Sequence, residues 1–229
     1  MEHTDAIRRA DLNAGKIVAI DKPVDWTSFD VVNKLRGMTK VKKVGHAGTL
    51  DPFATGLLLV CFASATKQVN QLMELEKEYE GTFELGRETD SHDVTGKIIA
   101  QHPAPELSRA EIEAAVKKYR GEILQVPPMF SALKRDGKKL YELARQGEEV
   151  ELEARPVKIY AFDILDVSLP EIRFRVVCSR GTYIRALARD LGRDLGCGAF
   201  LKTLRRTRVG DYKVENALSI QQFAERLAP

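Results

Sequence analysis

The sequence has few cysteines, lacks a long apolar run and has no strong excess of either charge. Its three cysteines are scattered and form no C-x-x-C pair, which argues against a disulfide framework or a zinc site. No stretch approaches the roughly 20 apolar residues that a membrane span needs. The first residues, Met1-Glu2-His3-Thr4-Asp5, are polar and acidic and so differ from a signal peptide. These absences predict a cytoplasmic protein with buried thiols.

The composition is typical of a globular protein with an ordinary core. Of the 229 residues, 44% are hydrophobic and 30% are charged, and the formal net charge is +3. So mild a positive charge neither requires nor excludes a nucleic-acid partner, because a local basic patch matters more than the sum. One β-rich domain of this length is ordinary, so we expect residues 1–229 to form a single domain.

Hydrophobic patterns predict strands and helices that intermix without a regular βαβ period or an internal repeat. The expected strands are 16–20, 57–62, 79–85 (half-exposed), 157–167, 171–178 and 202–209. The expected helices are 28–37, with Ser28 as N-cap and Gly37 at its end, 66–75, 108–119, with a capping box of Ser108 and Glu111, 184–195, and one capped by Ser219 and Gln222. The pattern predicts an α+β fold with a central mixed, mostly antiparallel sheet flanked by helices.

The region 127–155 differs in character from the rest of the chain. It contains Pro127-Pro128, an expected turn at Asp136-Gly137 and a short lysine-rich helix around Leu140. We interpret it as an excursion from the core.

The most informative segment is Gly45–Gly56, which reads Gly-His-Ala-Gly-Thr-Leu-Asp-Pro-Phe-Ala-Thr-Gly. Small residues, a turn proline and a closing glycine frame one carboxylate, Asp51, and the apolar run Leu57–Val60 follows directly. This pattern places Asp51 on a tight loop that leads into a buried strand, and such loops often carry catalytic side chains. On local chemistry alone, an aspartate before proline is more often a turn or cap residue.

Segments spread over most of the chain resemble the TruB family of tRNA pseudouridine synthases. Gly45–Gly56 resembles the catalytic motif of that family, and Asp21-Lys22-Pro23 resembles its N-terminal Lys-Pro motif. The other similar segments are 77–79, 86–93, 131–134, 137–142, 154–156, 179–185, 195–199 and 204–206. They follow the family's order from Asp21 to Arg206.

The resemblance implies the pseudouridine synthase fold, with residues 127–155 as a thumb-like insertion. Bacterial members of the family commonly carry a C-terminal PUA RNA-binding domain, and we expect this chain to depart from them by lacking it, because it ends at Pro229. It implies that uridine is converted to pseudouridine at position 55, in the T-loop of tRNA. That reaction breaks the C1′–N1 bond, rotates the uracil and rejoins it through C5, so it requires neither a cofactor nor a metal. The expected partner is the T-arm stem-loop of tRNA with its target base flipped out, and the expected state is a monomer.

The resemblance also assigns catalytic roles. Asp51 is the expected nucleophile, with attack at C1′, attack at C6 and removal of a 2′ proton all left open. Arg185 is its expected partner, because a nearby guanidinium lowers the pKa of a carboxyl. However, Arg185, Arg189 and Arg193 are spaced i, i+4, i+8, which by itself predicts a solvated helix face. Tyr79 is expected to stack on the uracil and to take part in catalysis.

Four further residues are expected to bind the substrate: His46, Tyr183, Leu204 and Lys22. The resemblance implies that His46 touches the RNA beside the target base. A metal-binding role for it is disfavoured, because the other histidines show no zinc spacing. Tyr183 would line the uracil pocket, although packing is an equally good account of it. Leu204 would on its own be taken for a core residue.

The charged clusters have simpler interpretations as well. Glu88, Asp90 and Asp93 lack the EF-hand spacing and indicate a polar loop. Basic groups at 40–43, 134–139 and 205–208 could be solvated faces, but they flank the family motifs. We therefore expect them to contribute to an RNA footprint.

Three alternatives stay open at this point. The chain could be a tRNA-binding or tRNA-folding protein, or a guide-RNA-dependent relative that needs partner proteins. It could also be an aspartyl-phosphate enzyme, but such enzymes place a second aspartate two residues after the first, and this is missing after Asp51. Activity of the isolated protein on bare tRNA separates an independent enzyme from the first two.

Overall fold

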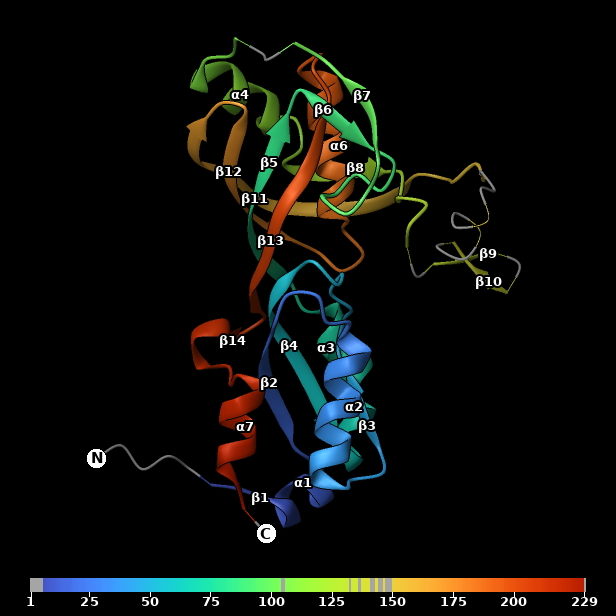
Figure 1. Ribbon diagram of the computed structural model, residues 1–229, viewed down its shortest axis with the longest axis vertical. Coiled ribbons are helices and arrows are strands. Elements are labelled where there is room, and N and C mark those ends of the chain that lie inside the picture. The colour runs from blue at the N-terminus through green and yellow to red at the C-terminus, as the bar shows by residue number, and fades with distance from the viewer. Residues whose placement is uncertain are drawn as a thin grey trace. The chain divides into compact units, whose positions relative to one another are not determined.

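The computed structural model describes residues 6–103, 106–131, 133–135, 137–140, 143, 146 and 150–228. The chain forms two compact units: unit 1 comprises Met1–Tyr79 and Leu204–Pro229, and unit 2 comprises Glu80–Thr203. Strands β5 (Lys77–Leu85) and β13 (Ala199–Val209) carry the chain from one unit into the other (Figure 1).

Unit 1 is built around strand β4 (Thr55–Phe62). Strands β2 (Ile17–Lys22) and β3 (Val44–His46) pair with it in antiparallel fashion, whereas β13 is parallel to it, with Arg206 opposite Gly56. The remaining elements are α1 (Arg9–Gly15), α2 (Ser28–Thr39), the 3-10 helix Ala63–Gln68, α3 (Val69–Glu74), β14 (Tyr212–Lys213), the 3-10 helix Val214–Asn216, α7 (Ile220–Arg226) and the parallel pair β1 (Ile7–Arg8) and β15 (Leu227–Ala228).

The apolar run of β4 supplies both cores of unit 1. Leu58, Val60 and Phe62 belong to one buried cluster, which also contains Leu35 of α2 and Phe223 of α7. The alternate residues Leu57, Leu59 and Cys61 belong to a second cluster. Successive side chains of a strand point to opposite faces, so a strand covered on both faces is apolar throughout. The predicted buried strand is therefore confirmed.

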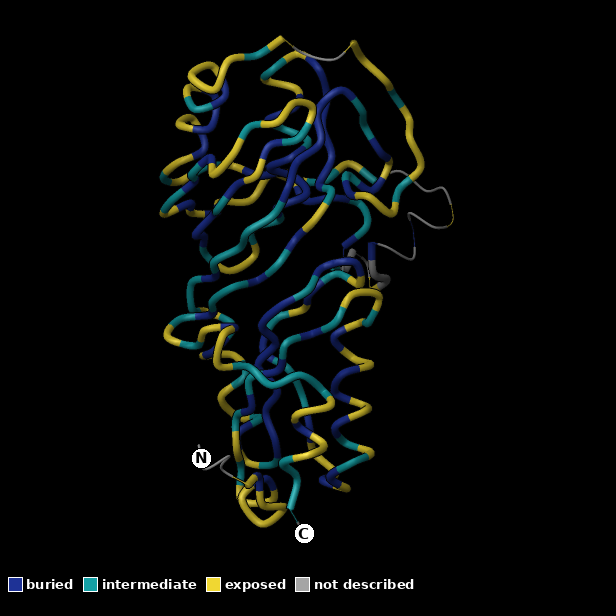
Figure 2. The backbone as a smooth tube through the Cα atoms, turned by 60° about the vertical axis from the view of Figure 1, so that its left-hand side comes forward, coloured by how far each residue is buried: buried dark blue, intermediate teal, exposed yellow. Residues whose placement is uncertain are grey.

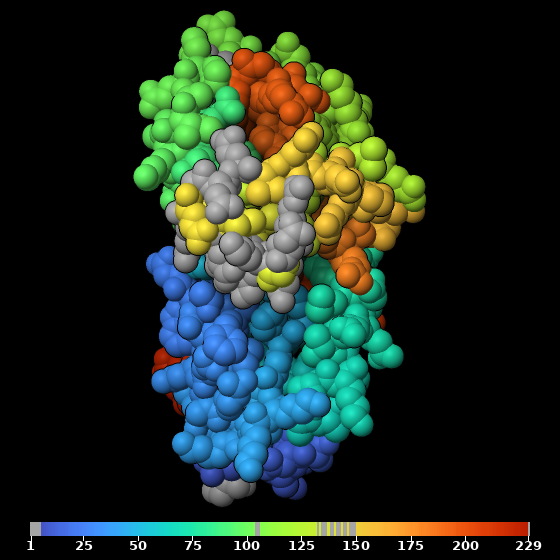
Figure 3. All heavy atoms as spheres, turned by 90° about the vertical axis from the view of Figure 1, so that its right-hand side faces the viewer, coloured from blue at the N-terminus to red at the C-terminus, as the bar shows by residue number. Residues whose placement is uncertain are grey.

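The N-cap of helix α2 lies one residue earlier than expected. Thr27, not Ser28, is the N-cap, and its hydroxyl accepts from the backbone N–H of Asp30 in a capping box. The helix also continues past Gly37 to Thr39, and its C-cap residue Lys40 adopts the left-handed conformation with φ of 61°. Figure 2 shows exposed residues along its outer side, and Figure 3 shows that α2 and the segment after it cover much of unit 1 on that face.

Unit 2 contains the antiparallel strands β8 (Gly121–Gln125), β11 (Arg155–Ser168) and β12 (Glu171–Cys178), with β11 paired to both others. Phe83 of β5 stacks on Phe174 of β12 with ring centroids 4.0 Å apart, and Phe162 of β11 meets both rings edge-on. The other elements are the hairpin β6 (Arg87–Thr89) and β7 (Ile98–Gln101), α4 (Arg109–Lys117), α6 (Ile184–Asp194) and the hairpin β9 (Lys134–Arg135) and β10 (Lys138–Lys139).

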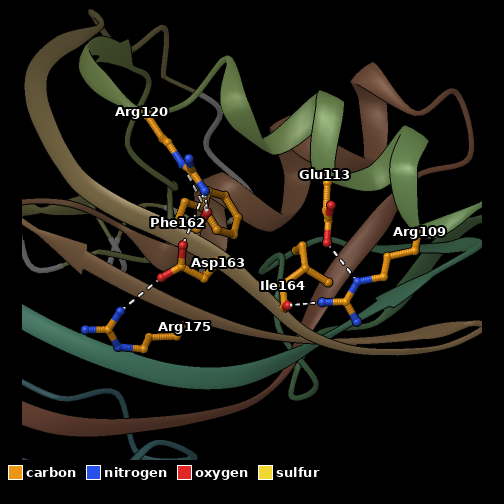
Figure 4. A network of polar contacts seen from close by, with 7 residues as sticks. All are labelled: Arg109, Glu113, Arg120, Phe162, Asp163, Ile164 and Arg175. Carbon is orange, nitrogen blue, oxygen red and sulfur yellow. Dashed lines mark hydrogen bonds and ion pairs between the residues drawn. The ribbon is translucent and has the colours of Figure 1, made fainter.

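Strand β11 is longer than its neighbour β8, which pairs only with residues 155–159. Beyond residue 159, arginine side chains donate hydrogen bonds to backbone carbonyls of β11 (Figure 4). Arg109 donates to the Ile164 carbonyl at 2.7 Å, and Arg120 donates to the Phe162 carbonyl at 2.8 Å. Asp163 pairs with both Arg120 and Arg175, at 3.2 and 2.9 Å. Backbone acceptors of this part of β11 are therefore bonded to arginine side chains from α4 and from the turn that follows it.

The predicted fold class, a mixed and mostly antiparallel sheet flanked by helices, is confirmed. The expected half-exposure of strand 79–85 is wrong at its end, because Phe83, Glu84 and Leu85 are all buried. The carboxylate of Glu84 is bonded there to Lys202 at 3.1 Å and to Arg87.

The region 127–155 is described only in part. The hairpin β9–β10 lies within it, but Asp136 of the expected turn falls outside the described residues. The single domain and the thumb-like insertion stay predictions.

Candidate active site

Asp51 lies in unit 1, on the loop that joins β3 to β4. The residue is half-buried, whereas Leu50 before it and Phe53 and Ala54 after it are buried. The Ala54 N–H donates to the Asp51 carbonyl at 3.1 Å, which closes a tight turn at the aspartate. The carboxylate is therefore presented by a loop whose apolar neighbours are anchored in the core.

The residue before Asp51 is held by a serine from helix α2. The Ser28 hydroxyl accepts from the Leu50 N–H at 2.9 Å and donates to the Leu50 carbonyl at 3.3 Å. Both backbone polar groups of Leu50 are thus satisfied by one buried side chain. Because Ser28 is not used as the helix cap, its hydroxyl is available for this contact.

The residue after Asp51 is held by Lys22, whose side chain is fully buried. Its ammonium donates to the carbonyls of Pro23, Trp26 and Pro52 at 2.9, 2.5 and 3.1 Å. Burial lowers the pKa of Lys22 to about 8, against the raising effect of the nearby Asp51 carboxylate. Within unit 1, Lys22 thus fixes the backbone beside Asp51, which is a different task from the direct substrate contact that we expected.

Arg206 bonds to backbone carbonyls before and after the Asp51 turn. Its side chain is 1% exposed and donates from Nε to the Leu57 carbonyl at 2.7 Å, and from Nη2 to the Gly48 carbonyl at 3.1 Å. Gly56 makes this approach possible, since it has φ of +101° and a Cβ there would lie 2.3 Å from the Arg206 carbonyl oxygen. The glycine that closes the motif is thus required by the neighbouring strand.

The other expected site residues of unit 1 lie on its strands. His46 ends β3 and is half-buried, and burial and the Arg206 charge lower the pKa of its imidazole, which is therefore neutral at pH 7. Its Nδ1 is buried and has no hydrogen-bond partner in the described part of the chain. Tyr79 is half-buried on β5, and Leu204 is buried on β13.

Arg185 lies in unit 2, in the first turn of α6, and is 4% exposed. Its guanidinium donates to the Ser91 carbonyl at 3.2 Å and to the Phe130 carbonyl at 2.8 Å. It also forms an ion pair with Asp93 at 3.4 Å. The interpretation of Arg185 as part of a solvated helix face is therefore wrong, and it holds only for Arg193, whose side chain is 72% exposed.

Asp93 is a buried residue whose role the sequence did not reveal. It was expected in a polar loop, but it is 3% exposed and organises that loop. Its Oδ1 accepts from the Ser91 hydroxyl at 2.7 Å, and from the Thr95 N–H and hydroxyl at 2.9 and 2.5 Å. Its Oδ2 faces Arg185. The polar residues around it indicated a polar loop but gave no sign of a partner far along the chain.

Tyr183 is the N-cap residue of α6 and is held by a glutamine of β8. The buried Gln125 side chain accepts from the Tyr183 N–H at 2.8 Å and donates to the Tyr183 carbonyl at 3.1 Å. This clamp fixes where α6 begins, and so where Arg185 lies. Gln125 gave no signal in the sequence, because its partner is 58 residues away.

The three basic groups that were expected to contact RNA differ in exposure and pairing. Arg205 pairs with Asp21 at 2.7 Å, Arg206 is buried, and Arg208 pairs with Glu76 at 2.7 Å, so this group is mainly structural. In contrast, the lysines of the segment 40–43 are all exposed, as an RNA footprint requires. The basic side chains of the group 134–139 lie outside what the structure describes.

Within the described residues, no group of three or more His, Cys, Asp and Glu side chains is placed to hold a metal ion. Among the described helices, none combines the length and apolarity that crossing a membrane demands.

The sequence matches two family models, one directly after the other. The model of the N-terminal domain of the TruB family pseudouridylate synthases matches residues 36–184, and that of the tRNA pseudouridylate synthase B C-terminal domain matches residues 185–228. The chain belongs to the TruB family. Both the Asp51 loop and the segment that carries Asp93 fall within the first model.

Similar TruB proteins come from several bacteria. The chain is 49% identical over 220 residues to a protein of Flavobacterium johnsoniae named tRNA pseudouridine synthase B, covering 93% of this chain and 96% of that one. A protein of the same name from Parabacteroides distasonis is 48% identical over 223 residues, covering 95% of each chain.

Solved structures with the same fold belong to larger chains. The archaeal box H/ACA sRNP Nop10–Cbf5 complex contains a chain with a TM-score of 0.70 and 28% identity, covering 93% of this chain and 54% of that one. An H/ACA RNP bound to a substrate RNA containing 2′-deoxyuridine gives a TM-score of 0.71 and 26% identity, covering 98% of this chain and 59% of that one. This chain therefore spans just over half of the length of those proteins.

Proposed function

We propose that this TruB-family protein isomerises uridine to pseudouridine in the T-loop of tRNA, at position 55, with Asp51 as its nucleophile. The relatives that match nearly full length are named tRNA pseudouridine synthase B, which supports tRNA as the substrate. The observation that supports Asp51 as the nucleophile is that hydrogen bonds fix the backbone on both sides of it. Ser28 holds the residue before it, and Lys22 holds the residue after it.

The reaction exchanges one bond of the base for another. The C1′–N1 bond breaks, the uracil turns while it stays bound, C5 bonds to C1′, the C5 proton leaves to solvent, and N1 takes up a proton in its place. Attack at C1′, attack at C6 and removal of a 2′ proton all require an ionised carboxylate in a fixed position. A rigid loop supplies that position without further ordering during the reaction.

We assign the other residues to the same uridine. Tyr79 stacks on the flipped uracil and Tyr183 lines its pocket, because aromatic faces suit an unstacked base. His46, which is neutral, contacts the RNA beside the target, and Leu204 contacts the uracil. Arg185 acts as a buried cation that stabilises the nucleophile, and the exposed lysines of segment 40–43 bind phosphates.

The first experiment measures tritium release from a tRNA transcript labelled at uridine C5. Wild type should release the label of one uridine per tRNA, whereas Asp51→Asn should release none while still binding the tRNA. Asp211→Asn makes the same charge change at an exposed position of unit 1 and is the matched control. Release by Asp51→Asn at the wild-type rate would refute the nucleophile assignment.

Two alternatives have their own outcomes. The solved structures from H/ACA complexes favour a relative that works with partner proteins, and such a relative would be inactive alone on bare tRNA. A tRNA-binding protein without catalysis would bind tRNA, and Asp51→Asn would change nothing. The nearly full-length match to relatives named as tRNA pseudouridine synthases favours the independent enzyme, which we expect to be active as a monomer.

A further inference from the structure

The hydroxyl of Ser131 is buried and forms no hydrogen bond with the residues that the structure describes. Ser131 is 5% exposed, and its Oγ has no hydrogen-bond partner in the part of the chain that the structure describes. Leaving a buried hydroxyl unpaired is unfavourable, and most buried polar side chains in folded proteins have a partner. Ser28 and Thr39, each 2% exposed, follow that rule, since both of their hydroxyls are bonded. Ser131 is an exception that calls for a partner.

The position of Ser131 connects it to the arginine of the proposed site. The Phe130 carbonyl, directly before Ser131, accepts from Arg185 Nη2 at 2.8 Å. The Ser131 N–H donates to the Met129 carbonyl at 2.9 Å, which fixes the backbone at this point. Arg185 is itself held by Asp93 and by the Ser91 carbonyl. The unpaired hydroxyl is therefore one residue along the backbone from an atom that binds the buried guanidinium.

We propose that Ser131 is a substrate-binding residue whose hydroxyl bonds to the flipped target nucleoside, through its ribose 2′-hydroxyl or a polar edge of its uracil. This rests on the proposed function. A serine hydroxyl both donates and accepts, so it matches neutral groups of this kind. Its surroundings disfavour a phosphate, because the carbonyls of Met129 and Phe130 are next to it and Arg185 is already bonded to Asp93.

The test is Ser131→Ala in the full chain, with two measurements. The first is urea unfolding, for which we expect a midpoint equal to or above that of wild type, since an unpaired buried hydroxyl has been removed. The second is the Kd for a T-arm stem-loop RNA, which we expect to rise roughly 5- to 10-fold, the effect of one neutral hydrogen bond. The control is Thr66→Val, which removes a half-buried hydroxyl that donates to the Ala63 carbonyl at 2.7 Å and should lower the unfolding midpoint without changing the Kd.

Substituted RNAs identify the atom that Ser131 contacts. If the partner is the 2′-hydroxyl, an RNA with 2′-deoxyuridine at the target position abolishes the difference between wild type and Ser131→Ala. If the partner is uracil, the difference persists with 2′-deoxyuridine and disappears with an abasic target.

A difference that survives both RNA changes points to phosphate and overturns the proposal, as does an unchanged Kd. A lower unfolding midpoint with wild-type affinity also overturns it, because the hydroxyl would then have its partner inside the protein. If wild type itself fails to bind the RNA, the proposed function fails, and the unfolding comparison still decides whether Ser131 has a partner within the chain.

Discussion

The buried ion pair between Asp93 and Arg185 gives a prediction whose size can be worked from the contacts. Asp93→Asn keeps Oδ1, so the bonds from Ser91 and Thr95 can remain. It replaces Oδ2 by an amide that presents hydrogens to the guanidinium. Removing one charge of a buried pair costs about 3–5 kcal/mol. Arg185 keeps its two carbonyl acceptors, so we expect the lower end, a fall in the free energy of unfolding of about 3 kcal/mol.

The same substitution should affect catalysis, because Arg185 is proposed to stabilise the nucleophile. A displaced guanidinium that costs about 3 kcal/mol in the transition state corresponds to a kcat roughly a hundredfold lower. Urea unfolding and tritium release at saturating tRNA measure the two effects. Thr95→Val is the control, because it removes one donor to Oδ1 and leaves the ion pair intact. Wild-type stability and kcat in Asp93→Asn would refute the reasoning.

Three other predictions follow from the site. Arg185→Lys should lose most of its tritium-release activity, because an ammonium cannot reach Asp93 and both carbonyls with the planar geometry of a guanidinium; near-normal turnover would contradict this. Gly56→Ala should lower the free energy of unfolding by at least about 2 kcal/mol in urea titration, since its Cβ would meet the Arg206 carbonyl at 2.3 Å with a positive φ. Turnover should fall above about pH 8, where folded Lys22 loses the proton with which it holds the Pro52 carbonyl. In the unfolded chain the pKa of Lys22 is the ordinary 10.5, so between about pH 8 and 10.5 the unfolded state binds more protons than the folded state. The contribution of Lys22 to the free energy of unfolding therefore increases as the pH rises through this range. A pH–rate profile of Lys22→Met that retains the fall would show that another group causes it.

Local patterns predicted the long strands and helices of this fold, because such patterns depend on neighbouring residues, but they did not predict the short helix α1 or the strands β3 and β8. The apolar run of β4 and the capping boxes at Ser108 and Ser219 are where their sequences placed them. The error at α2 is informative. Thr27 and Ser28 are adjacent hydroxyl residues, and only the contact of Ser28 with Leu50, 22 residues away, decides which of them caps the helix.

The surroundings of the site residues were harder to predict from the sequence, because they come from distant parts of the chain. Spacing could not separate Arg185 from Arg193, whose burial differs because only Arg185 meets the loop of Asp93. Charge likewise suggested that Arg206 is exposed, but carbonyls about 150 residues earlier bury it. The sequence motif predicted Asp51 as a site residue, but the contacts of Ser28 and Lys22 that hold its loop could be seen only in the structure.

The arginine contacts along β11 have a consequence for how copies of this protein meet. The exposed side of a strand is a template for another strand, and pairing there begins many aggregates. Arg109 and Arg120 already occupy the carbonyls of Ile164 and Phe162. An approaching chain would have to displace two charged side chains before it could form its first bonds. The same contacts that fasten these arginines to the sheet therefore protect the protein from joining edge to edge at high concentration.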